Sequence, residues 1–173
     1  KNDGLATTAG YRLAQGTADT PIFQVADATT AATATGTTDT DGAWFFYCGT
    51  WSNSGDSATI YINGASEASA SGTLVVSLSN AVALITGEAA GGAGDALGAI
   101  AYNQVFTAVL TLVEIAELRF KPEYTNTSIG GFWPLWGDST EIDLGPSDLT
   151  GTVTGATTSS DGPPVMFGGG LPL

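Results

Sequence analysis

The chain contains no histidine, one cysteine and only four basic residues among its 173 residues. The absence of histidine excludes Ser–His and Cys–His catalysis and the usual zinc sites. Cys48 has no second cysteine with which to form an internal disulfide, and its apolar neighbours predict a buried thiol. No apolar run reaches the ~18 residues of a membrane-spanning helix, so no membrane partner is expected.

Charged residues make up 12% of the chain, against about 25% in an average domain, and most of them are acidic. The formal net charge is −13, and the basic residues are Lys1, Arg12, Arg119 and Lys121. These positions cannot form the basic patch that phosphate binding requires, which excludes nucleic acid as a partner. Few basic residues also leave few sites for trypsin-like proteases, which suits a protein exposed outside the cell.

Strand and turn signals alternate along the first part of the chain and predict an all-β fold. Residues 11–15 and 21–27 are short strand patterns separated by a turn-prone segment, and residues 28–40 are either an edge strand or a loop. Residues 43–51 are apolar on both faces, which predicts a strand in the middle of a sandwich and not at its rim.

A hairpin follows, because the pair Asn63-Gly64 tolerates positive φ at both positions and lies between two strand patterns within residues 57–69. The length of the chain fits one domain with a substantial core. Further strand patterns occupy residues 72–79, 81–88 and 99–106.

The segment TLVEIAELRFK carries the one convincing helical pattern. Thr111 and Glu114 form a capping box, in which each side chain bonds the other residue's backbone N–H. Arg119 and Lys121 lie at the negative end of the helix dipole, and Pro122 ends the helix. We expect the helix to lie as a lid on the sandwich, with an apolar face of Leu112, Ile115, Ala116 and Arg119, widened by Val113 and Leu118.

Beyond residue 122 glycine and proline become frequent, which divides the chain into a β domain, residues 1–122, and a C-terminal extension, residues 123–173. Two clusters of large apolar residues indicate that contacts order this extension. We expect the first cluster to pack on the chain's own sandwich and the terminal one to make assembly contacts with a neighbouring subunit. The clusters are Phe132, Trp133, Leu135 and Trp136, and then Val165, Met166, Phe167, Leu171 and Leu173.

Short motifs follow one another in a definite order between residues 41 and 118: DGAW, CGTW, IYING, and IAYNQVF running into LTLVEI. In this order they resemble the LamG-like jelly roll of the concanavalin A-like lectin and glucanase superfamily. The resemblance implies an antiparallel jelly-roll β-sandwich with one short helix and an extended C-terminal arm. Members of that family usually carry further strands before the equivalent of Lys1, so we expect either preceding strands or a neighbouring chain to complete the sheet.

The motifs FWPLWGDS, GTVTGA and PPV of the extension are similar to those that follow such domains in tailed-phage virion proteins. This resemblance implies a non-catalytic structural protein, a capsid decoration or surface component of a tailed bacteriophage. The implied partners are the major capsid protein, other virion proteins and further copies of the chain on the virion surface. The alternative is a secreted, lectin-like or adhesive module that binds cell-surface glycans.

Glu141 and Asp143 are separated by one residue, so on a strand they point from the same face. Glucanases of the superfamily use the motif E-I-D-x-E, but here its last position is Gly145, and the second carboxyl group of a retaining glycosidase is missing. We therefore expect no enzyme activity and interpret both residues as solvated surface carboxylates. Carboxylate oxygens are ligands for Ca²⁺, so Asp138, Glu141, Asp143 and Asp148 are weak candidates to bind this ion.

The four tryptophans divide into two pairs. Trp44 and Trp51 lie in the run that is apolar on both faces, so we expect them in the core. Trp133 and Trp136 lie in the extension, where they either stack on glycans or dock the extension on the sandwich.

Overall fold

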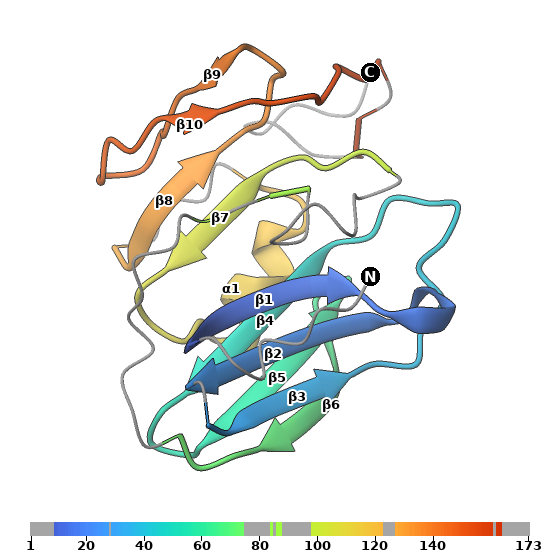
Figure 1. The fold of residues 1–173 in the computed structure, drawn as a ribbon, viewed down its shortest axis with the longest axis vertical. Coiled ribbons are helices and arrows are strands. Elements are labelled where there is room, and N and C mark those ends of the chain that lie inside the picture. The colour runs from blue at the N-terminus through green and yellow to red at the C-terminus, as the bar shows by residue number, and fades with distance from the viewer. Residues whose placement is uncertain are drawn as a thin grey trace.

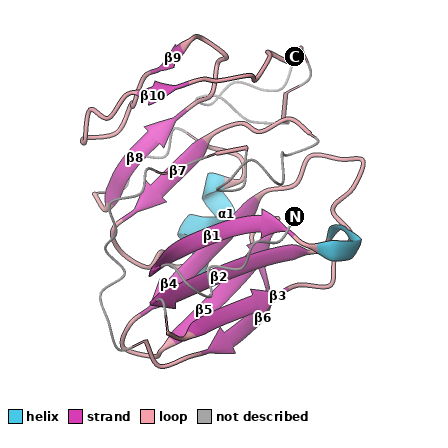
Figure 2. Cartoon of the chain, in the orientation of Figure 1, coloured by secondary structure: helices cyan, strands magenta, loops and turns pink. Residues whose placement is uncertain are grey.

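The computed structural model describes residues 9–27, 29–74, 84, 86–87, 98–122, 127–160 and 162–163. These residues form an all-β sandwich of antiparallel sheets with one short α-helix, which confirms the predicted fold class (Figures 1 and 2). The first sheet contains β1 (Ala9–Gln15), β2 (Pro21–Asp27) and β3 (Ala31–Thr35) in that order. The second contains β4 (Tyr47–Ser52), β5 (Ser57–Ile62) and β6 (Ala65–Ser71), and a single 3₁₀ turn, η1 (Thr17–Asp19), joins β1 to β2.

The main hydrophobic core lies between these two sheets. Every second residue of β5 is buried, as expected for a strand that presents one face to a core. Gly49 in β4 makes room for the ring of Phe23, because a Cβ atom at position 49 would lie 2.1 Å from Phe23 Cδ2. The buried residues of this core are Phe23, Val25, Ala32, Ala34, Ala58, Ile60 and Ile62.

The prediction that residues 43–51 form a middle strand is wrong. Among the described strands, β4 pairs only with β5 and lies at the edge of its sheet, and residues 43–46 precede it as irregular chain. Both faces of β4 are nevertheless covered. Tyr47 and Trp51 pack on the main core, whereas Cys48 packs on the opposite side in a second cluster. One face of β4 is thus covered by the main core of the sandwich and the other by the cluster beneath α1. Its apolar character on both faces does not come from a position between two strands.

The predicted hairpin is confirmed at Asn63 and Gly64, which join β5 to β6 with φ angles of 52° and 85°. The turn also contacts two distant elements. Asn63 Oδ1 accepts the backbone N–H of Phe46 at 3.1 Å, and the carbonyl of Asn63 accepts a hydrogen bond from Arg119 at 3.3 Å. A Cβ atom on Gly64 would lie 3.1 Å from Ala116 Cα, so the absence of a side chain lets the helix approach.

The helix is α1 (Leu112–Leu118), and its predicted capping box is present. Thr111 Oγ1 accepts the N–H of Glu114 at 3.3 Å, and Glu114 Oε2 accepts the N–H of Thr111 at 2.7 Å. The buried side of α1 is formed by Ile115 and Leu118, which are 0% and 4% exposed. With Leu110 they form the second cluster, against which Phe46, Cys48, Tyr61 and Phe106 pack.

The predicted apolar face of this helix is partly wrong. Leu112, Val113 and Ala116 were expected to face the sandwich, but all three are exposed. The residues of α1 are apolar over more than half its circumference, and one supporting layer can bury only part of that surface. The structure therefore leaves an apolar side of α1 facing outward.

The extension packs on the chain's own β region. β8 (Ile129–Trp133) pairs with β7 (Asn103–Phe106), and β9 (Thr140–Glu141) pairs with β10 (Gly151–Thr152) farther out (Figure 1). Phe132 of β8 is buried, as expected for the first cluster. The expected strands within residues 72–79 and 81–88, and the terminal cluster from Val165 to Leu173, lie largely or wholly outside the described residues. No helix in the described ranges has the length and apolar character needed to cross a membrane.

Candidate functional site

Asp143 is only 6% exposed, and both of its carboxylate oxygens bind backbone groups of the extension. Oδ1 accepts the N–H groups of Phe132 and Gly145, each at 2.7 Å, and Oδ2 accepts that of Leu149 at 3.1 Å. Burial disfavours the charged form, but the three hydrogen bonds together outweigh this desolvation and hold the pKa of Asp143 below its ordinary value. Asp143 therefore acts as an ionised connector between β8 and the loop that follows β9.

Glu141 of β9, two residues before Asp143, is 3% exposed, and it too binds the backbone of the extension. Its two oxygens accept the backbone N–H groups of Trp136 and Gly137, at 3.1 and 2.6 Å. Those groups point back toward Glu141 because Leu135 and Gly137 both adopt positive φ, 62° and 87°.

The pair therefore shares one face, as predicted, since Ile142 between them is exposed. The interpretation as solvated surface carboxylates is wrong. What the sequence does not reveal is that two tight bends in the extension return unpaired backbone N–H groups to this face. These groups require acceptors, and an ionised carboxylate is the strongest acceptor available.

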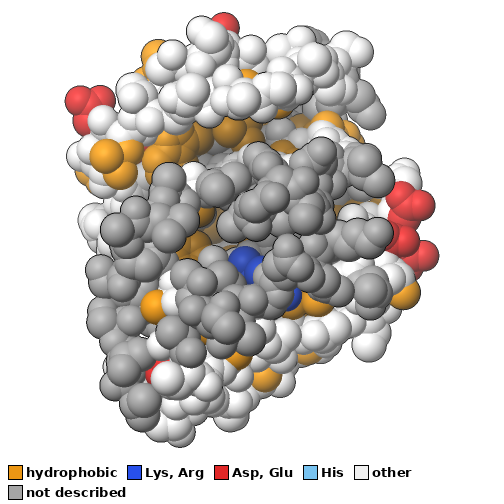
Figure 3. Space-filling model, in the orientation of Figure 1, with side chains coloured by type: hydrophobic (Ala, Val, Ile, Leu, Met, Phe, Trp, Pro, Cys, Tyr) orange, Lys and Arg blue, Asp and Glu red, His pale blue; other side chains and the backbone are white. Residues whose placement is uncertain are grey.

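The weak candidates for a Ca²⁺ site do not come together. Asp138 and Asp148 are exposed, whereas Glu141 and Asp143 are buried and bonded to the backbone. Within the part of the chain that the structure describes, no group of three or more acidic or cysteine side chains is arranged to hold a metal ion. On the face drawn in Figure 3, acidic side chains are visible at several separate places near the edge.

Trp133 is held inside the extension. Its indole N–H donates to the carbonyl of Leu149 at 2.7 Å, and a Cβ atom on Gly131 would lie 2.4 Å from its ring. A ring in contact with the backbone on one side and hydrogen-bonded at its edge holds parts of the extension together and presents little surface to a ligand.

Trp136 differs, because it is 59% exposed and is the most exposed aromatic residue in the described ranges. Its backbone N–H is bound by Glu141, and Gly137 beside it fits closely against Thr158, where a Cβ atom would lie 2.1 Å from Thr158 Cγ2. The indole of Trp136 is thus an exposed flat aromatic surface on a constrained turn. Trp44 and Trp51 were expected in the core. Trp51 packs against the main core, as expected, whereas Trp44 is only half-buried.

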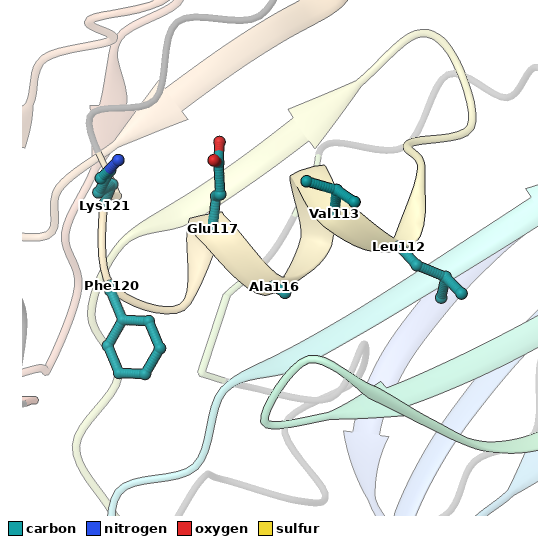
Figure 4. A pocket seen from close by; sticks show the side chains of 6 residues that line it. All are labelled: Leu112, Val113, Ala116, Glu117, Phe120 and Lys121. Atoms are coloured by element: carbon teal, nitrogen blue, oxygen red, sulfur yellow. The ribbon is translucent and has the colours of Figure 1, made fainter.

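The outer side of α1 is a surface that the sequence analysis missed. An open groove there is lined by Leu112, Val113, Ala116, Glu117, Phe120 and Lys121 (Figure 4). The guanidinium of Arg119 lies 4.8 Å from the centre of the Phe120 ring, a cation–π contact. The available signal was the excess of apolar residues in the helix, more than a single packed face can use.

Cys48 is the one cysteine of the chain. Burial raises the pKa of its thiol to about 12, so the thiolate that acts as a nucleophile is scarce at neutral pH. Cys48 is half-buried and packs in the second cluster, so the predicted packing role is confirmed but full burial is not.

Comparison with protein families gives one match. The model of the concanavalin A-like lectin/glucanases superfamily matches residues 2–116, which is 115 of the 173 residues. The matched region includes both three-stranded sheets and most of α1, and it ends before the extension. Searches of curated proteins and of solved structures give no match.

Proposed function

The chain belongs to the concanavalin A-like lectin/glucanase superfamily, and we propose that it is a non-catalytic structural member on the surface of an extracellular particle. The observation that carries this proposal is that the carboxylates and the indole that could form a site in the extension bind its own backbone instead. Glu141, Asp143 and Trp133 all bind the backbone of the extension itself. Residues that serve in this way stabilise an arm and are not presented to a substrate.

The setting that we propose is a tailed-phage virion, where the chain is a capsid decoration or surface component in contact with the major capsid protein. Support comes from the similarity of the extension motifs to those of virion proteins and from the scarcity of sites for trypsin-like proteases. Attachment to a repeating lattice also favours a small domain, because many weak contacts together give a strong attachment.

Quantitative mass spectrometry of purified particles tests this proposal. Chymotrypsin suits the digest, since the chain has four basic residues but 16 residues of Phe, Trp and Tyr. We expect many copies per particle, retained after washing at high salt. Detection of the chain only as free protein in the medium, and not in particles, would contradict the structural role.

A second candidate is glycan binding, favoured by the exposed indole of Trp136 on its constrained turn. Sugar rings stack on flat aromatic surfaces of this kind, and the family includes lectins. The test is a glycan array with the whole chain, its Trp136→Ala variant and, as a control, Tyr11→Ala, which removes a 49% exposed ring from β1. Saturable binding that only Trp136→Ala abolishes would establish the lectin function, whereas an array without binding would argue against it.

A further inference from the structure

We propose that the outer face of the extension, formed by Ile142 and Leu144, docks on a different protein through an apolar patch that is bordered by lysine or arginine. This inference rests on the proposed structural role, and it names the surface that meets the particle and the kind of partner that fits it. The first observation is where apolar exposure gathers. Four of the exposed large apolar residues in the described ranges lie within residues 136–149: Trp136, Ile142, Leu144 and Leu149, which are 59%, 53%, 51% and 58% exposed.

The alternation of burial from Glu141 to Leu144 is the reverse of the usual one. A strand at a protein surface ordinarily turns apolar side chains inward and polar side chains toward water. Here the carboxylates of Glu141 and Asp143 are buried, and the aliphatic side chains of Ile142 and Leu144, which alternate with them, are exposed. The segment is held by the N–H of Leu144, which donates to the carbonyl of Phe132 at 2.7 Å. Two aliphatic side chains therefore meet water where carboxylates would ordinarily do so.

The inward carboxylates fix this surface in place, because each binds a different part of the extension. Glu141 accepts the N–H of Trp136 at 3.1 Å, and Asp143 accepts the N–H of Leu149, also at 3.1 Å. The backbones of the two other exposed apolar residues are thereby attached to the segment that carries the outer face. A surface that is ordered before contact loses less conformational entropy when the contact forms.

The outer face belongs to one end of the molecule. Figure 1 shows β9 and β10 at the end away from the two three-stranded sheets, with β7 and β8 between. A partner can therefore reach Ile142 and Leu144, which follow β9 directly, without displacing the sandwich. Exposed apolar surface that gathers in one place is typical of sites that bind another protein.

Charge identifies the kind of partner. Residues 123–173 contain six acidic residues and no basic one. Exposed Asp138 precedes Ile142 by four residues, and exposed Asp148 follows Leu144 by four. A second copy docked through the same face would bring these acidic residues against each other, which is unfavourable in a contact that excludes water. Lysine or arginine around an apolar patch instead places opposite charges at the rim, while the apolar centre supplies a contact that salt does not screen.

Photo-crosslinking in purified particles tests the proposal. The whole chain, with Leu144 replaced by the photoreactive residue benzoylphenylalanine, is produced in cells that assemble the particle, and the purified particles are irradiated. The same replacement at Val113 is the control, because Val113 is 68% exposed on α1 and lies outside the extension. We expect position 144 to give a product with a different protein that position 113 does not give. Chymotryptic peptides of that product should contain lysine or arginine beside the attachment point.

A second measurement is the number of copies per particle for a variant that combines Ile142→Ser with Leu144→Ser. Truncating the apolar centre of an interface should lower this number about tenfold when the chain is in short supply. The control combines Leu112→Ser with Val113→Ser, which removes equally exposed aliphatic groups from α1 and should leave the copy number unchanged. Thermal melting of each variant checks that it folds.

Several outcomes would overturn the proposal, and the mass of the product separates them. They are a product of two copies of the chain, a link from position 144 only to the chain itself, an attachment site without basic residues, no product, or an unchanged copy number in the Ile142 and Leu144 variant. If the chain is nevertheless present in particles, the structural role stands and only this face is wrong. A chain that is absent from particles would overturn both.

Discussion

Replacing Asp143 with asparagine should destabilise the protein strongly, although the two side chains have nearly the same shape. The amide keeps one oxygen for Phe132 and Gly145, but it places an NH₂ group against the N–H of Leu149, where Oδ2 now accepts. One bond is lost, and two bonds to a charged acceptor become neutral. A hydrogen bond to a charged group contributes about 1.5–3 kcal/mol and a neutral one about 0.5–1.5 kcal/mol, so we expect a total loss of about 3.5–6 kcal/mol.

The pH dependence of this loss distinguishes the ionised connector from simple packing. The pKa of Asp143 is lowered from its ordinary value of 3.8 in the folded state, so its contribution to stability is fully present above that value. The contribution is lost as the pH falls through the folded pKa. The difference in unfolding free energy between the original chain and Asp143→Asn should therefore be constant near neutral pH and shrink below about pH 4.

Urea denaturation followed by tryptophan fluorescence at several pH values measures this difference, and thermal melting at neutral pH should show a shift of about 2–4 °C per kcal/mol. Asp138→Asn is the matched control, because Asp138 is an exposed aspartate in the same extension. Equal stability of the two variants at neutral pH, or a deficit in Asp143→Asn that persists unchanged at low pH, would refute the reasoning.

Three further predictions concern the sandwich and its helix. Thr111→Ala should lower stability by about 1 kcal/mol through loss of the cap, measured by urea denaturation, and Thr111→Ser should restore most of it; equal stability of both variants would mean that the cap contributes nothing. Gly49→Ala should cost about 1–3 kcal/mol because its methyl group overlaps Phe23, whereas Gly98→Ala, with open space around it, should be near neutral in the same melting experiment. Cys48 should react with a thiol reagent at pH 8 only after unfolding in urea, and immediate reaction of the native chain would contradict its burial.

Features that depend on neighbours in the sequence could be predicted from it. The Asn63-Gly64 turn requires positive φ at two adjacent residues, and the capping box of α1 requires two residues three positions apart. Both were located correctly because the chemistry is complete within a few residues. The all-β class followed from many such local signals together.

Features that depend on distant partners could not be predicted in this way. β4 was placed in the middle of a sheet because the sequence shows that both faces are apolar, but not which element covers each face. The buried state of Glu141 and Asp143 depends on N–H groups from Trp136, Phe132 and Leu149, which reach them through the bends of the extension. Amino-acid composition does not indicate which backbone N–H groups a bend of the chain will bring to a given side chain.

The turn at Asn63 and Gly64 has a consequence for engineering the protein. Hairpin tips are ordinarily good places to insert a peptide tag or to open the chain for circular permutation, because little contacts them. This tip instead meets the segment just before β4 through Phe46, and it meets the helical segment through Ala116 and Arg119. An insertion there would separate three elements at once. The loop between β4 and β5, whose residues 53–55 are exposed, is the place in this hairpin unit where a label can be carried without that cost.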